Sequence, residues 1–353
     1  VLDEIVRLEH LADVVEIRAH ANQQPPGADA LGGGLGNRTD GFTQSKDLTR
    51  IRVSYSSIGA ASLPTWVAVD AGIFHKHGLD VGLIYIGGGP RAMSTTIANE
   101  TQITQGAGTG SILARLGGAD TVTVATLLDT TPQSLMANAN IRSPQDLKGK
   151  KLGVTRFGAL SDFGLRKYLQ KVGLDAEKDV TILQLGGLAE ILAALQSGAI
   201  HGGALSSPAL TKAKQLGFKE MMDLGDLGIR YPGLSYMTTE AYIKTNRPIV
   251  INFLKAIIES THYLKRNKDL SLRVLKKYTK IDEPAVLEET YQLFTQRYFR
   301  LVPVSSAEEI KTVLDQIKDK DPRARTTDYD SFIRGDLLRE IEQSGFIKQL
   351  AKG

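Results

Sequence analysis

Residues 151–207 read KLGVTRFGALSDFGLRKYLQKVGLDAEKDVTILQLGGLAEILAALQSGAIHGGALSS. Short apolar runs alternate in this stretch with longer segments of helical periodicity, and loops rich in glycine, alanine and serine follow the runs. The order is strand, small-residue loop, helix, Gly-Leu-Asp, strand, Gly-Gly, helix and strand. Such alternation predicts an α/β fold in which helical crossovers join parallel strands.

Residues 51–111 repeat this order. They read IRVSYSSIGAASLPTWVAVDAGIFHKHGLDVGLIYIGGGPRAMSTTIANETQITQGAGTGS. The Gly-Leu-Asp of residues 78–80 recurs at residues 173–175, and in both stretches a glycine pair follows the next strand. An internal repeat of this kind predicts two similar lobes, which form a natural binding cleft between them.

The two ends of the chain differ from the repeated part. Residues 1–46 combine one amphipathic stretch with a linker rich in glycine and proline, and we expect an N-terminal extension there without an assigned function. The sequence from Arg247-Pro248 onward is strongly periodic, and proline suits the first turn of a helix. This region predicts a helical C-terminal tail that packs on the first lobe.

Composition excludes several classes of protein. The 353 residues include 43 Lys and Arg against 39 Asp and Glu, and the small basic excess is scattered, so we expect no nucleic-acid partner. The chain has no cysteine, which excludes disulfides, thiolate nucleophiles and cysteine metal sites. No apolar run reaches the roughly 18 residues of a transmembrane helix, and no secretory signal peptide is visible in the sequence.

Loops of small residues follow nearly every predicted strand. They lie at residues 56–59, 87–89, 106–111, 156–162, 186–187 and 206–207. Ligands of open parallel sheets bind at the carboxyl ends of the strands, where loops lead into helix N-termini that favour anions. One such loop is an ordinary βα turn, but matching loops in both halves predict a ligand held between two lobes.

Two motifs resemble a known family. The first is Ala71-Gly72-Ile73-Phe74, followed by Gly78-Leu79-Asp80-Val81 and the glycines at 87–89; the second is SPQDLKGKKLGV at residues 143–154. The first resembles the opening of nitrate/sulfonate/taurine-type substrate-binding proteins of ABC importers, and the second resembles the signature that opens their second lobe. The resemblance covers the chain from about residue 50 to residue 345 and leaves out residues 1–46.

The resemblance implies the type II fold of periplasmic binding proteins, with two Rossmann-like lobes, a hinge and a central cleft. Lobe 1 would comprise residues 47–137 and 235–353, lobe 2 residues 138–234, with crossings near Asn138 and Leu234. The implied function is to bind a small anionic or zwitterionic organic molecule by hinge closure and to deliver it to importer transmembrane subunits on other chains. The resemblance further implies a periplasmic or other extracytoplasmic location; we expect a monomer without a cofactor.

Arg156 and Arg91 are the candidate anion-binding side chains, because guanidinium groups pair with carboxylates, sulfonates or phosphonates through bidentate hydrogen bonds. Polar groups, glycines and aromatic residues near the same loops complete the predicted ligand-binding set: Ser57, Ser62, Trp66, Gly88, Gly108, Thr109, Ser161, Asp162, Ser207 and Tyr231. Some also suit a structural role, since Ser161 and Asp162 can cap a helix and Trp66 can pack against the sheet. His75 and His77 have no third partner in the sequence pattern, so we predict no metal site.

Two alternative functions remain open. Gly106-x-Gly108-x-Gly110 resembles a dinucleotide loop, although Ser111 stands where that fingerprint needs its last glycine. Some enzymes share the binding-protein fold, and the family motifs that carry their chemistry use cysteine, which this chain lacks. An enzyme of this fold that acts on a pyrimidine-like metabolite is the first alternative. The second alternative is a ligand-sensing receptor domain for a membrane kinase, which would have the same sequence features.

Overall fold

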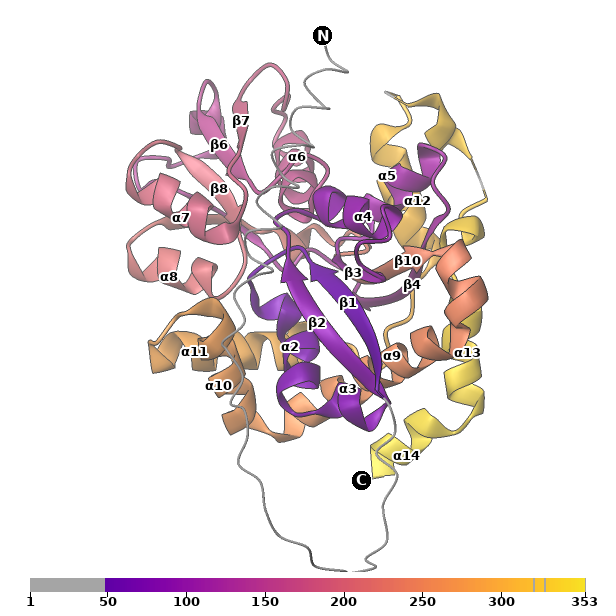
Figure 1. Ribbon diagram of the computed structural model, residues 1–353. Helices are drawn as coiled ribbons and strands as arrows, with labels where there is room; N and C mark the ends of the chain where they lie inside the picture. Colours follow the sequence, from indigo (N-terminus) through magenta and orange to yellow (C-terminus); the bar gives the residue numbers. More distant parts are fainter. Residues whose placement is uncertain (1–47, 320, 327, 353) are drawn as a thin grey trace, which may run out of the picture. The chain divides into compact units, whose positions relative to one another are not determined.

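The computed structural model of the chain describes residues 48–319, 321–326 and 328–352 (Figure 1), and the predicted extension and linker of residues 1–46 lie outside this part. The strands are β1 (Thr49–Tyr55), β2 (Leu79–Tyr85), β3 (Ile103–Gly106), β4 (Thr121–Leu128), β5 (Ser134–Ala137), β6 (Lys151–Val154), β7 (Thr181–Gln184), β8 (Gly202–Leu205), β9 (Lys219–Asp223) and β10 (Leu234–Thr239). The α-helices are α2 (Leu63–Asp70), α3 (Ile73–Lys76), α4 (Gly89–Ile97), α5 (Thr109–Leu116), α6 (Leu160–Lys171), α7 (Leu188–Gln196), α8 (Ala209–Gln215), α9 (Glu240–Arg266), α10 (Lys268–Thr279), α11 (Pro284–Leu293), α12 (Ala307–Ile317), α13 (Gly335–Gln343) and α14 (Phe346–Lys352).

The strands form two five-stranded sheets that share one plan. The order is β2-β1-β3-β10-β4 in the first sheet and β7-β6-β8-β5-β9 in the second. In each sheet the first three positions hold parallel neighbours, and the fourth position holds an antiparallel strand, β10 or β5. The predicted α/β class is confirmed, and the repeat seen in the sequence corresponds to this shared strand order.

The chain crosses between the sheets twice. β4 of the first sheet leads to β5 of the second, and β9 of the second sheet leads to β10 of the first. β5 already pairs with β8 and β9, so the first crossing precedes Ser134. The sequence motifs had implied a crossing near Asn138, a few residues too late. A four-residue strand that is buried throughout carries no alternation from which the sequence could assign it to a lobe. β10 begins at Leu234, so the second crossing ends there.

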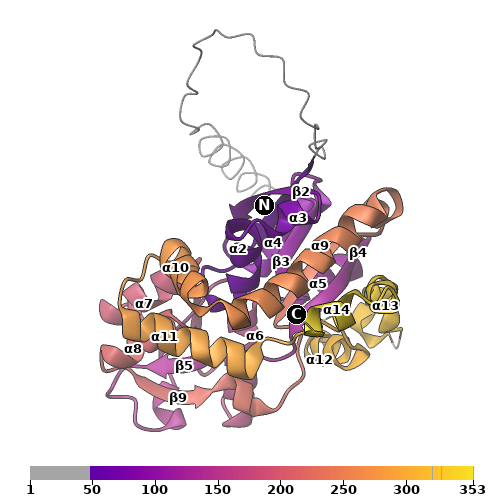
Figure 2. The ribbon, with the colours of Figure 1, turned by 90° about the horizontal axis from the view of Figure 1, so that it is seen from below.

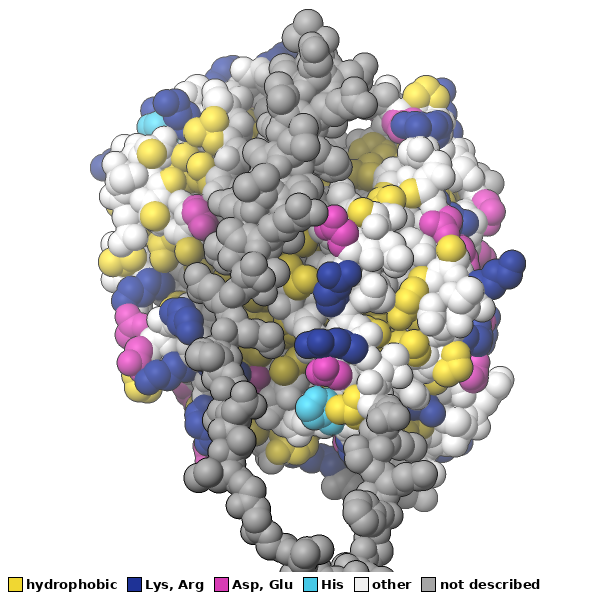
Figure 3. All heavy atoms as spheres, in the orientation of Figure 1, with side chains coloured by type: hydrophobic (Ala, Val, Ile, Leu, Met, Phe, Trp, Pro, Cys, Tyr) yellow, Lys and Arg dark blue, Asp and Glu magenta, His cyan; other side chains and the backbone are white. Residues whose placement is uncertain are grey.

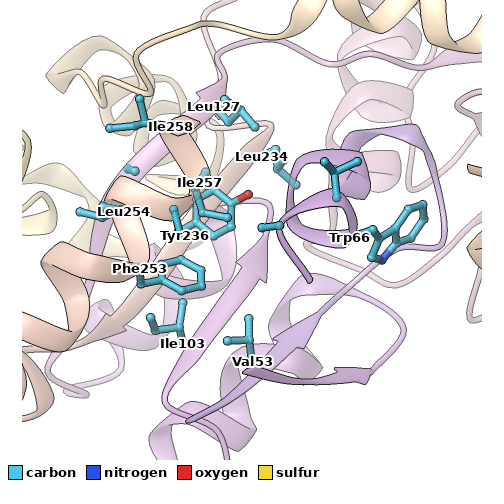
Figure 4. Close-up of a cluster of buried hydrophobic side chains, with 14 of the residues drawn as sticks. Val53, Trp66, Ile103, Leu127, Leu234, Tyr236, Phe253, Leu254, Ile257 and Ile258 are labelled. Atoms are coloured by element: carbon cyan, nitrogen blue, oxygen red, sulfur yellow. The ribbon is translucent and has the colours of Figure 1, made fainter. Parts of the chain in front are cut away.

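Helices cover both faces of each sheet. In the first sheet, α4 and α5 lie on one face and α2, α3 and α9 on the other (Figures 1 and 2). Tyr236 and Phe253 pack edge to face in the core under α9, with ring centroids 5.4 Å apart, and Figure 4 shows Leu254 and Ile257 beside them. In the second sheet, α6 covers one face and α7 and α8 the other.

The C-terminal region is helical, as the sequence predicts. The backbone of α9 is non-helical at Asn246, so a new helical segment begins at Arg247-Pro248. α9 and α13 pack on the first sheet, but α11 contacts α8 of the second sheet. Lys212 of α8 forms an ion pair with Glu283 at the start of α11. The tail therefore touches both sheets, whereas the sequence led us to expect it on the first lobe alone.

The two crossing segments lie side by side and form the hinge. Tyr231 N donates to Asp129 O over 2.9 Å, and Gly233 N donates to Leu128 O over 2.9 Å. The Asp129 carboxylate also pairs with Arg230 and Arg300. A Cβ atom at Gly233 would lie only 1.9 Å from Thr130 O, so this close backbone approach requires glycine.

We predict that Gly233→Ala destabilises the protein, because the new methyl group meets backbone atoms that no side-chain rotation can move. Overpacking of this kind costs about 1–3 kcal/mol. The midpoint of chemical denaturation should fall relative to Gly82→Ala, where the nearest atom to a new Cβ lies 3.9 Å away. Equal midpoints for the two variants would contradict this role of Gly233 in the hinge.

Candidate functional site

Loops at the carboxyl ends of the parallel strands of both sheets meet. Ala60 N, after β1, donates to Ser207 O, after β8, over 3.0 Å. A Cβ atom built on Gly87 would lie 2.7 Å from Gly186 O, so the loops after β2 and β7 are also in contact. We call the residues at this junction the inter-sheet site: Ser56, Ser57, Tyr85, Gly87, Gly88, Gln105, Arg156, Gly186, Gly187 and Ser206.

The side chain of Arg156, with its cationic guanidinium group, extends from the second sheet to the first. It lies in the loop after β6, and its aliphatic stem packs on Gly88, where a Cβ atom would lie 2.3 Å from Arg156 Cγ. The Nε atom of Arg156 is buried and has no hydrogen-bond partner among the described residues. A buried donor without a partner costs about 1–3 kcal/mol. An acceptor placed against Nε would therefore stabilise the contact between the sheets.

Tyr85 lies among charged side chains from both sheets. Its hydroxyl is 3.2 Å from the Cβ position of Gly87 and 2.9 Å from that of Gly187. Burial raises the pKa of the Tyr85 phenol and Glu190 raises it further, whereas Arg156 and Arg91 lower it. Because the net shift is upward, the phenol is a neutral hydrogen-bond donor at neutral pH.

Aromatic rings form one side of the site. Tyr55 and Tyr85 end neighbouring strands, and their ring centroids are 5.5 Å apart. Trp66 contacts Tyr55 edge-on and stacks on Tyr278 with centroids 4.7 Å apart. Trp66 is fully buried in the core of the first sheet, so it has the packing role that the sequence offered as the alternative. Tyr55 and Tyr85 were missed because both lie inside predicted strands rather than in the loops.

Hydroxyl groups from opposite sheets come together near Gly59. A Cβ atom at Gly59 would lie 3.4 Å from Ser57 Oγ and 3.3 Å from Ser206 Oγ. Ser207, the residue predicted from the sequence, turns its hydroxyl to Thr211 Oγ1 at 3.2 Å and borders a separate cavity of about 460 Å³ between α8 and α11. The Ser206 hydroxyl, and not that of Ser207, lies near Gly59, whereas Ser207 contributes its carbonyl oxygen to the contact between the sheets.

The Ser62 hydroxyl is hydrogen-bonded to two residues of its own sheet and does not face the opposite sheet. Its hydroxyl donates to Ser57 O over 2.8 Å and accepts from Gln105 Nε2 over 3.1 Å. Gln105, at the end of β3, was missed in the sequence. The signal that would have found it is a long polar side chain at the carboxyl end of an otherwise apolar strand.

Gly108, Thr109 and Tyr231 form a second group near the hinge. Gly108 N donates to Pro232 O over 2.8 Å, and the hydroxyls of Thr109 and Tyr231 are hydrogen-bonded. The Tyr231 ring stacks on Phe163 of α6, and burial raises the pKa of the Tyr231 phenol. Since the hydroxyls of Thr109 and Tyr231 are hydrogen-bonded to each other and the Tyr231 ring stacks on Phe163, these residues connect the two sheets without a ligand.

Ser161 and Asp162 organise the loop after β6. Ser161 Oγ accepts from Thr155 N over 2.9 Å, and Asp162 accepts from Gly158 N over 2.9 Å and from Arg166 Nε over 2.7 Å. Both side chains thus bond to the backbone of the preceding loop. Among the described residues, no side chain caps α6 at its N-cap residue Ala159, so the helix-capping role that the sequence offered beside ligand binding is wrong. Ser161 and Asp162 instead fix the loop that carries Arg156.

No group of three or more His, Asp or Glu side chains in residues 48–352, as far as they are described, could hold a metal ion. Among the described helices, none has the length and apolar character needed to cross a membrane. Figure 3 shows basic and acidic side chains interspersed on the visible face, without a broad basic patch.

Residues 60–269 match the family described as NMT1/THI5 like. This segment is more than half of the chain. The chain belongs to the NMT1/THI5-like family. A curated relative is the "putative binding protein YtlA" of Bacillus subtilis (strain 168), which is 24% identical over 284 residues, 77% of this chain and 85% of that protein.

Solved structures of periplasmic binding proteins share the fold. The alkanesulfonate-binding protein SsuA of Xanthomonas axonopodis pv. citri, bound to MOPS, is 18% identical with a TM-score of 0.69 over 82% of this chain and 99% of that chain. The nitrate-binding protein NrtA of Synechocystis PCC 6803 is 14% identical with a TM-score of 0.71 over 84% of this chain and 89% of that chain. The binding-protein fold that the sequence motifs implied is therefore confirmed.

We predict that Gly88→Ala keeps the two sheets apart. Gly88 has a φ of +86°, and its missing Cβ would overlap the stem of Arg156. We expect a larger radius of gyration in X-ray scattering than for the unmodified protein. Gly186→Ala is the matched control, because its φ of +93° imposes similar backbone strain but nothing lies within 4 Å of the new Cβ. Identical scattering for the two variants would contradict the role assigned to Gly88.

Proposed function

We propose that this chain is the solute-binding component of an ABC importer, which closes its two lobes on a small molecule at the inter-sheet site. Family membership, the fold of the neighbours and the name of the curated relative support the proposal. The observation that carries it is the buried and unpaired Nε of Arg156 at the contact between the sheets. A ligand that bridges the two sheets and accepts this hydrogen bond stabilises the closed form over the open one.

We propose a small anionic or zwitterionic organic ligand. Two arginines, Arg156 and Arg91, act on the Tyr85 phenol against one carboxylate, Glu190, so the site offers cationic groups to an anion beside this one acidic side chain. Arg156 offers its free Nε–H, Tyr85 a neutral hydroxyl, and Ser57 and Ser206 two further hydroxyls, all of which suit an oxyanion. The structural neighbours are described as binding an alkanesulfonate and nitrate, which makes sulfonates and nitrate the first probes.

We propose binding without chemical turnover. The chain has no cysteine, the residue on which enzymes sharing this fold depend for their motifs. The inter-sheet site itself consists of hydroxyls, one amide, one guanidinium and glycine backbone, with the Glu190 carboxylate beside Gly187 and Tyr85. The bound molecule is delivered outside the cytoplasm to importer subunits encoded as separate chains.

A thermal-shift screen of the purified protein tests this function, with sulfonates, taurine, nitrate, carboxylates, phosphonates and pyrimidines as probes. Ligand at a hundredfold excess over its Kd stabilises the folded state by about 2.7 kcal/mol. We expect a higher melting temperature with at least one oxyanion, which is then recovered unchanged. Conversion of the ligand would favour an enzyme of the same fold, and no shift from any oxyanion would contradict the proposed ligand class.

We predict that Arg156→Ala weakens binding of the oxyanion found in this screen by roughly 10-fold or more. A hydrogen bond to a charged group contributes about 1.5–3 kcal/mol, and each 1.4 kcal/mol is about a factor of ten. Isothermal titration calorimetry measures the change, and Arg142→Ala, an exposed arginine of the second sheet's surface, is the control. Unchanged affinity of the Arg156 variant would remove this residue from the site.

A further inference from the structure

We propose that Gln105 makes the inter-sheet site selective for ligands that carry a hydrogen-bond donor, an amine or a hydroxyl, in addition to their anionic group. The inference rests on the proposed function and narrows its ligand class. It follows from the position of Gln105, from the fixed orientation of its amide and from the matching unpaired group on the opposite sheet.

Gln105 lies at the carboxyl end of β3, directly behind the loop after β1. The main-chain carbonyl oxygen of Gln105 accepts a hydrogen bond from Ser56 N over 3.0 Å, and only 1% of the residue is exposed. The next residue, Gly106, packs against Ser56 and the loop after β2, because a Cβ at Gly106 would lie 2.7 Å from Ser56 Oγ and 3.6 Å from Gly89 Cα. The main chain at Gln105 and Gly106 is thus held against the loop after β1 and the start of α4.

The neighbouring hydroxyl fixes the orientation of the amide. A serine hydroxyl has one proton to donate, and Ser62 donates it to Ser57 O over 2.8 Å. Ser62 Oγ can therefore only accept from Gln105, which places Nε2 toward Ser62 at 3.1 Å and turns Oε1 away from it. Oε1 is buried and has no hydrogen-bond partner among the described residues.

The unpaired groups of the two sheets are complementary. Gln105 Oε1 is an acceptor from the first sheet, and Arg156 Nε is a donor from the second. Gly88 packs on Arg156, and Gly89 at the start of α4 packs on Gly106, the residue after Gln105. A ligand with an anion for Arg156 and an N–H or O–H for Gln105 satisfies both groups, whereas an apolar end leaves Oε1 unpaired.

An unpaired buried group is not sufficient evidence by itself. Gln133 Oε1 and Trp66 Nε1 are also buried without a partner among the described residues. Gln133 lies in the first crossing and borders the cavity between α8 and α11, and Trp66 lies in the core against Tyr55. Gln105, in contrast, is bonded to the loop after β1. Location at the inter-sheet site is what distinguishes Gln105, and Gln133 provides a matched control of the same residue type.

Calorimetric titration of the full chain with three matched probes tests the inference: ethanesulfonate, 2-hydroxyethanesulfonate and taurine (2-aminoethanesulfonate). They share the anion and differ only in the donor at the far end. We expect the amino or the hydroxy probe to bind at least about tenfold more tightly than ethanesulfonate, because a site built to hydrogen-bond a ligand rejects the analogue that lacks the bond. In Gln105→Met the ratio between the donor-bearing probes and ethanesulfonate should fall to about one, because a thioether sulfur is only a weak acceptor.

Two further variants separate recognition from folding. Gln105→Glu keeps an acceptor oxygen and should keep the preference for taurine, even if its stability differs. Gln133→Met, with a side chain 5% exposed in the unmodified protein, should leave the ratio between probes unchanged. Loss of the ratio in Gln133→Met as well would overturn a specific role for Gln105.

Binding of all three probes to the unmodified protein within about twofold would overturn the inference, although the proposed function would stand. Failure of all three to bind would also overturn it, while the proposed function is judged on the whole panel of oxyanions. A preference that survives in Gln105→Met would assign the donor contact to another residue and equally overturn the proposal.

Discussion

The packing of Arg156 on Gly88 is the contact on which the rest of the site depends. It needs a residue without a side chain, held at positive φ, in one sheet, and a long side chain from the other. The contact between Gly88 and Arg156 brings the loops after β2 and β6 together. Tyr85 then lies close enough to Arg156 and Arg91 for both to lower the pKa of its phenol. The same packing buries the Arg156 Nε without a partner in the described part of the chain, and this creates the demand for an acceptor.

The hinge and the C-terminal helices limit how the sheets can move. Backbone hydrogen bonds tie the two crossing segments together, and Gly233 permits their close approach. On the same side, Arg297 after α11 pairs with Asp223 and Asp226 at 2.9 and 2.7 Å, which connects the tail to the second sheet. Opening therefore has to keep or exchange these exposed ion pairs, which contribute little each, while the loops of the inter-sheet site separate.

The sequence predicted the architecture better than the site. Alternating strands and helices, and the repeated Gly-Leu-Asp, sufficed for two α/β lobes, because the succession of elements along the chain indicates the fold class. Arg156, Gly88 and Ser57 lie at the junction of the loops, and their ligand-binding role stays a prediction. The Trp66 side chain lies in the core and the Ser207 hydroxyl points to Thr211, because sequence position cannot tell which way a side chain points once a loop closes. Gln105, Tyr55 and Tyr85 were overlooked because their strands appeared to serve the core alone.

The central claim is that the two sheets close on a ligand bound between them, and a distance measured across the site tests it most directly. The cysteine-free chain allows two exposed positions, Ser94 on α4 and Ala193 on α7, to be changed to cysteine and spin-labelled specifically. We predict that a ligand identified by thermal shift shortens and narrows the distribution of label distances at saturation. An unchanged distribution with the ligand bound would contradict closure of the two sheets, and with it the binding of a ligand at the inter-sheet site.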